Sequence, residues 1–159
     1  MSIVLDGSAG VTFPNGSNPQ AAPSKVLQVV QATTTGSSTT SSTSFVNTNL
    51  TATITPLFST SKMLVIVSGG DFDTQTNGRQ GWATIYRNST NIGNGSTGIS
   101  DWYNAGARQI GAISMILLDS PATTSSTTYS LYVRSDGSGS IICNGQQGIQ
   151  SITVMEIAQ

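Results

Sequence analysis

The sequence predicts an all-β fold, a jelly-roll sandwich of about eight to ten antiparallel strands with a short N-terminal β-arm. Helix-forming Lys, Glu and Arg are scarce among the 159 residues, whereas Thr, Val, Ile and Tyr fill the apolar stretches. Many of these stretches alternate apolar and polar residues with period two, as half-buried strands do. They recur at intervals of roughly 8–15 residues with no helical segment between them, which favours a sandwich over strand–helix units.

The first 24 residues predict an arm and a linker, and residues 25–159 a single β domain. Two short apolar stretches, Ile3–Leu5 and Val11–Phe13, flank a turn, and a segment rich in Pro and Gly follows them. The arm is too short to bury its own apolar side chains, so we expect it to attach to a particle or to pack on a neighbouring subunit or on the main domain. The residues expected to make that attachment are Ile3, Val4, Leu5, Val11 and Phe13.

The first half of the domain predicts three strands and one hydroxyl-rich segment. A strand begins at Val26, and Phe45–Thr55 alternates as a half-buried strand that Pro56 ends. Between them, Thr33–Ser44 contains only Ser, Thr and Gly36, and it is either a loop or the edge of a hairpin. We favour a loop with some extended structure. Lys62–Gly69 is continuously apolar at its centre, so in a strand both of its faces should be covered.

The second half predicts a turn over the Gly- and Asn-rich segment Asn91–Ile99 and a series of further strands. Gly111 lies within the longest of these strands, where it favours a bulge. The expected strands are Gly81–Asn88, Gln109–Asp119, Thr127–Ser135, Ser140–Asn144 and Ser151–Ile157.

The composition argues against catalysis, nucleic-acid binding and metal binding. The chain has no His, 8% charged residues and a net charge of −1, so it lacks the usual general acid–base side chain and any basic patch. Asp71–Gly78 resembles a calcium loop, but its Gly is eighth rather than sixth and no Glu follows at the twelfth position. We therefore expect a solvated turn there, a protein that is not an enzyme, and neither metal nor cofactor.

Three further features concern cellular context. The N-terminus has no basic region followed by an apolar stretch, so no signal peptide is expected. The longest apolar runs are far too short to span a bilayer, which argues against membrane insertion. Cys143 follows two isoleucines and is expected to be a buried small hydrophobe.

One polar-aromatic cluster, Asp101, Trp102, Tyr103 and Asn104, is the candidate recognition loop. Neighbouring residues in extended chain point in opposite directions, so either Trp102 or Tyr103 should face outward. Exposed aromatic rings beside Asn and Asp are typical of saccharide-binding surfaces and of protein interfaces. Burial in the core or in a subunit interface is the favoured interpretation of this cluster, and glycan contact is the alternative. Trp82 and Tyr86 are expected to be core or interface residues.

Two sets of segments resemble known proteins. The segment Val11–Ser17, with Gln20-Ala21-Ala22 after it, resembles the F-P-D/N-G-T/S…Q…A-A segment of tailed-phage fibre and virion proteins. The chain from Lys25 onward resembles the trimeric C1q/TNF-like jelly rolls at the ends of viral fibres. The segments that carry this second resemblance are Lys62–Val67, Ala83–Asn88, Tyr129–Arg134 and Ser151–Ile157.

The resemblance implies a homotrimer, with apolar residues of one sheet packed between subunits, in a virion assembled in the host cytoplasm. The expected function is a non-enzymatic short tail fibre or receptor-binding tip, with other virion proteins as partners and a host surface glycan as a candidate ligand. About 24 residues precede the domain, less than a fibre shaft usually provides, so we expect a compact virion component. The alternatives are a capsid decoration or cement protein, a soluble carbohydrate-binding module and, last, a polysaccharide depolymerase.

Overall fold

The computed structural model describes residues 4–6, 10–12, 25–75 and 77–159, and every regular element within them is a β-strand. β1 and β2 form a hairpin in the arm, and the other strands belong to the domain. The strands are β1 (Val4–Asp6), β2 (Gly10–Thr12), β3 (Val26–Thr34), β4 (Ser38–Thr40), β5 (Val46–Ile54), β6 (Lys62–Asp73), β7 (Gln80–Arg87), β8 (Thr90–Asn91), β9 (Ser100–Tyr103), β10 (Ile110–Asp119), β11 (Thr127–Ser135), β12 (Ile141–Cys143) and β13 (Gln150–Ile157).

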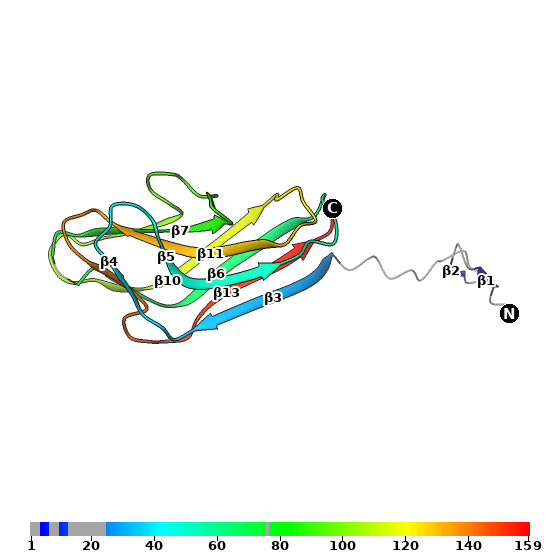
Figure 1. Cartoon of the computed structure of the whole chain (residues 1–159). Helices are drawn as coiled ribbons and strands as arrows, with labels where there is room; N and C mark the ends of the chain where they lie inside the picture. The colour runs from blue at the N-terminus through cyan, green and yellow to red at the C-terminus, as the bar shows by residue number, and fades with distance from the viewer. Residues whose placement is uncertain (1–3, 7–9, 13–24, 76) are drawn as a thin grey trace.

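The domain is a sandwich of two antiparallel sheets (Figure 1). In the first sheet β3, β13, β6 and β10 lie side by side, and β12 and β4 extend it beyond the end of β13. In the second sheet β5, β11 and β7 lie side by side, and both β8 and β9 pair with β7. The all-β sandwich predicted from period-two alternation is therefore confirmed.

The core lies between the sheets and follows from the alternation of each strand. Met63, Val65 and Val67 of β6 are buried, and Leu131 and Val133 of β11 are buried opposite them. Alternate residues of a strand point to opposite faces, so each long strand contributes every second side chain to the core and leaves the rest on the outer face. The outer faces of the two sheets are therefore the surfaces on which function must be sought.

Two expectations about local structure have different outcomes. Thr33–Ser44 is a loop with some extended structure, as predicted, because β3 continues to Thr34 and β4 pairs along β12 while the other residues of the segment belong to no strand. The bulge arises in β6 rather than at Gly111. Ala112 pairs with Asp71 and Ile113 with Gly69, so Gly70 is the extra residue, at a φ of 64° that glycine adopts without strain.

The arm contains an antiparallel hairpin in which Val4 pairs with Thr12 and Leu5 with Val11. Ile3 and Phe13, which the sequence also assigns to particle attachment, lie outside the described residues, as does the segment 13–24. In the domain, the backbone amide of Ala158 donates to the carbonyl of Lys25 at 2.8 Å, so the start of β3 and the C-terminus lie at the same end of the sandwich (Figure 1).

Candidate functional site

The outer face of the first sheet carries an aliphatic patch. Strand register places Val29, Met155 and Leu64 in one row across β3, β13 and β6, and Leu118 of β10 completes it. The next row ends in Ile66 and Ile116, which pair directly. The aliphatic patch consists of Val29, Leu64, Ile66, Ile116, Leu118 and Met155.

This patch is uncovered in the single chain. Ile116 is 64% exposed, Val29 54% and Leu118 53%. The third row across the same strands contains only hydroxyl side chains: Thr33, Ser151, Ser68 and Ser114. The aliphatic patch thus lies at one end of these four strands, and the hydroxyl row separates it from Ile110, which is 46% exposed at the other end of β10. A contiguous apolar patch of this kind marks an interaction site. Within the single chain the run Lys62–Gly69 has one buried face and one half-buried outer face, so the chain itself supplies full cover on one face only.

The outer face of the second sheet carries an aromatic patch. The rings of Tyr86 and Tyr132 stack with centroids 3.9 Å apart, and Phe45 meets Tyr86 edge-on at 6.4 Å. The guanidinium of Arg134 lies 3.8 Å from the ring centroid of Trp82 and 5.4 Å from that of Phe45. These five side chains are half-buried and together form the aromatic patch.

A hollow of about 400 Å³ opens beside this patch. Phe45, Tyr86 and Arg134 line it, and its remaining lining is polar: Thr43, Ser44, Gly95 and Ser96. Arg134 Nη1 donates to the carbonyl of Thr43 at 3.3 Å, and Nη2 donates to the carbonyl of Ser96. These two bonds fix the guanidinium between the segment before β5 and the loop before β9.

The predicted recognition loop is divided between the interior and the surface. Trp102 stacks on Phe72 at 4.2 Å against the core, and Asn104 is 3% exposed. Asn104 Oδ1 accepts from the amides of Gly106 and Ala107, which makes it a loop-stabilising residue. Asp101 and Tyr103 are exposed on β9, and the side chain of Gln80 donates to Asp101. The cluster therefore does not form one continuous aromatic surface.

The segment predicted as a solvated turn, Asp71–Gly78, begins inside β6 and is largely buried. Asp71 accepts from the amides of Gly145 and Gln146 at 3.2 and 2.9 Å. Asp73 forms an ion pair with Arg108 at 2.5 Å, and the hydrogen bond from this guanidinium lowers the pKa of Asp73. Both carboxylates are thus engaged within the protein. Within residues 25–75 and 77–159, no three His, Cys, Asp or Glu side chains gather as a metal site requires.

Two other titratable groups are held in their neutral forms. Cys143 is buried as predicted, and burial raises the pKa of its thiol to about 11. The Tyr129 hydroxyl donates to Asp119 at 2.7 Å inside the sandwich, and burial together with this carboxylate raises the pKa of Tyr129. A thiol with a raised pKa contains little of the nucleophilic thiolate at neutral pH.

The sequence did not indicate that Phe45, Tyr132 and Arg134 meet in one surface patch. The alternation of Thr127–Ser135 already placed Tyr132 and Arg134 on the face opposite Leu131 and Val133. It could not indicate which strands lie beside β11, and the register of β11 with β7 sets Arg134 against Trp82.

The chain matches no protein-family model and no curated protein. No helix in the described part of the chain is long and apolar enough to cross a membrane.

Proposed function

We propose that this protein is a non-enzymatic structural component of a tailed-phage virion, a homotrimeric short tail fibre or receptor-binding tip built on a jelly roll. The observation that carries the proposal is the aliphatic patch. An apolar surface of this kind on a soluble chain calls for a partner, and a second and third copy of the same chain provide one. The sequence resemblance to trimeric fibre-tip jelly rolls supplies the number of copies.

The order of the strands supports the jelly-roll assignment. Counting only β3, β5, β6, β7, β9, β10, β11 and β13 as strands one to eight, one sheet has the order 1-8-3-6 and the other 2-7-4-5. Successive strands alternate between the sheets except for the fourth and fifth, and the first strand pairs with the last. Two interleaved Greek keys of eight strands give this arrangement.

The two outer faces then have different positions in the trimer. The aliphatic patch faces the neighbouring subunits around the three-fold axis, and the aromatic patch on the other sheet faces outward. The arm, with Val4, Leu5 and Val11 in its hairpin, attaches the trimer to the particle.

The mass of the full chain in solution tests the trimer. Light scattering should give three times 16.4 kDa, and a monomer over the same concentration range would contradict the proposal. Deleting residues 1–24 should leave the trimeric state unchanged and abolish incorporation into the particle.

Imaging of the particle tests the site of assembly. Density for the trimer at the tail tip supports a receptor-binding role. Density at three-fold or quasi-three-fold positions of the capsid would instead support a decoration role. A decoration role predicts that capsids lose heat resistance when the protein is removed.

A further inference from the structure

We propose that the aromatic patch binds an acidic saccharide, with the aromatic rings contacting the faces of sugar rings and Arg134 pairing with the sugar carboxylate. The inference deepens the proposed function, on which it rests for its biological setting, because it names the ligand class of a receptor-binding tip. It also moves recognition from the loop at Asp101–Asn104 to the outer face of the second sheet.

The charge of Arg134 lacks a counter-ion among the described residues. Arg87 and Arg108 form ion pairs with Asp119 and Asp73, whereas none of the described carboxylates lies within ion-pair distance of Arg134. A guanidinium held between aromatic rings with no acidic partner is available to an anionic ligand.

The donors of this guanidinium are only partly used. Of its five N–H groups, one donates to Thr43 and one to Ser96, and the buried Nε–H has no partner. One N–H group on each terminal nitrogen therefore has no partner among the described residues, and the Arg134 side chain lines the hollow. A carboxylate accepts such a pair of donors in the forked geometry that arginine favours.

The surroundings of Arg134 suit a sugar. Phe45 and Tyr86 give the hollow an apolar wall, and Thr43, Ser44 and Ser96 border it with hydroxyl groups. Sugar rings present apolar C–H faces and polar hydroxyl edges, which match this combination of aromatic rings and hydroxyl-bearing residues. The volume of about 400 Å³ is within the range of small-ligand sites.

The site is also accessible in the proposed trimer. The aromatic patch and the aliphatic patch lie on the outer faces of different sheets, so subunit contacts through the aliphatic patch leave the hollow open. A protein partner would need a flat interface of roughly 800 Å² on each side, and a recessed hollow bordered by hydroxyl groups fits that role less well.

The decisive experiment is a titration of the full ¹⁵N-labelled chain with matched sugars. The probes are 3′-sialyllactose against lactose, and a hyaluronan tetrasaccharide against an N-acetylglucosamine tetramer. At least one acidic member should shift the amide resonances of Thr43, Ser96 and Arg134, while its neutral counterpart leaves them unchanged. Equal shifts with neutral and acidic members, shifts centred on Tyr103, or no shift with any probe would overturn the proposal.

Variants assign the effect to Arg134. Arg134→Gln should weaken binding of the acidic sugar about tenfold or more, since charge-assisted hydrogen bonds are lost. Lys62→Gln removes the same charge elsewhere and Tyr103→Ala removes an exposed aromatic ring, so both should bind as the native chain does. Undiminished binding by Arg134→Gln would contradict the proposal. If Arg134→Gln does not fold, Arg134→Lys keeps the charge without the fork and should bind with reduced affinity.

The mass of each variant separates this inference from the proposed function. A trimer that binds no acidic sugar refutes the saccharide site alone, and a monomer that binds one refutes the trimer alone. If Arg134→Gln changes the mass, the aromatic patch is a subunit contact, and the saccharide assignment is wrong.

Discussion

The two outer faces of the sandwich derive from the same alternation of side chains, yet they carry opposite chemistry. At one end of its strands the face of β3, β13, β6 and β10 presents the aliphatic patch, in which Ile116 and Leu118 extend into solvent, and a row of hydroxyl side chains lies beyond it. The face of β5, β11 and β7 presents stacked aromatic rings, one guanidinium and paired hydroxyls, such as Thr51 with Ser130 at 3.0 Å.

The difference indicates two kinds of partner. Aliphatic side chains make no directed bonds, so the first face is stabilised by any dry, complementary surface, such as copies of itself. Aromatic rings and arginine combine contact area with directed donors, so the second face suits a hydrated polar ligand. We therefore propose that one sheet serves assembly and the other recognition, and the following experiments test that division.

The largest expected effect comes from placing a charge in the aliphatic patch. Ile116→Lys should convert the trimer to a folded monomer, because a buried charge left without a partner costs about 3–5 kcal/mol. Light scattering measures the mass, and circular dichroism checks that the chain still folds. Ile149→Lys changes another exposed isoleucine outside the patch and should remain trimeric.

A lysine placed on the other sheet sharpens the comparison. Tyr132→Lys, on the aromatic patch, should leave the mass of the trimer unchanged. If the trimer survives Ile116→Lys but dissociates with Tyr132→Lys, the second sheet carries the subunit contact and the roles assigned to the two faces are reversed.

The next effect concerns the connection between the sheets. Asp119 of β10 accepts from Arg87 Nη1 at 2.7 Å and from the Tyr129 hydroxyl at 2.7 Å, and both donors belong to the other sheet. Asp119→Ala should lower the free energy of unfolding by about 3 kcal/mol, because buried donors lose their acceptor. Urea denaturation measures the loss. Asp101→Ala removes an exposed carboxylate and should change stability by less than about 0.5 kcal/mol.

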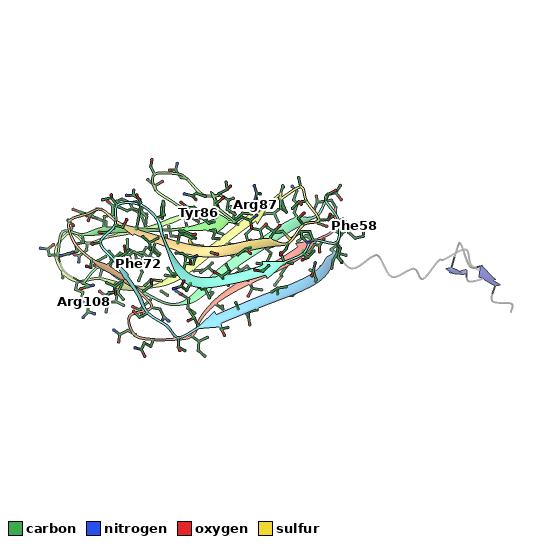
Figure 2. All side chains as sticks on the ribbon, viewed as in Figure 1. Phe58, Phe72, Tyr86, Arg87 and Arg108 are labelled. Atoms are coloured by element: carbon green, nitrogen blue, oxygen red, sulfur yellow. The ribbon has the colours of Figure 1, made fainter. Side chains whose placement is uncertain are left out.

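A smaller effect depends on pH. Glu156 of β13 is buried, and its carboxylate accepts from the side chain of Gln28 and the amides of Leu57 and Phe58. Through its bond to Phe58, Glu156 lies near the end of the sandwich that holds the C-terminus, and Arg108 lies at the opposite end (Figure 2). Burial alone would raise the pKa of Glu156, but these hydrogen bonds outweigh it and lower the pKa below 4.5.

Since the folded state has the lower pKa, Glu156 stabilises the protein above the unfolded value of 4.5, and this stabilisation is lost as the pH falls through the folded pKa. Unfolding free energies measured across the acid range should therefore decrease on acidification. Glu156→Gln should be less stable than the native chain at pH 7 and should show a shallower decrease. An equal decrease in both proteins would assign the acid sensitivity to other carboxylates.

The smallest effect tests the aromatic patch as a packed unit. A double-mutant cycle on Tyr86 and Tyr132, each changed to Ala, should give a coupling energy of about 1 kcal/mol from their stacked rings. The same cycle on Tyr86 and Tyr103 should give none, since the two rings make no contact with each other. A Tyr86–Tyr132 coupling near zero would mean that the two rings act separately, and it would weaken the case for a preformed surface.

Much of the fold could be predicted because the alternation within each strand shows which of its side chains face the core. The alternation in Thr127–Ser135 fixes Leu131 and Val133 inward and Tyr132 and Arg134 outward, as the structure has them. β9 was not expected, because Ser100–Tyr103 is short, shows no apolar alternation and is held by pairing with β7. Local pattern cannot reveal a strand that exists only through its partner.

By itself, the sequence determined the class of the molecule: a β-sandwich with a neutral, hydroxyl-rich exterior, a buried thiol and no histidine. The tertiary structure alone decided which outward residues meet. Val29 and Met155 are far apart in the chain, as are Phe45 and Arg134, and only strand register brings each pair into one patch. The period of two specifies the face of a side chain, whereas its neighbours across the sheet depend on the order and register of strands, which the packing of the whole domain sets.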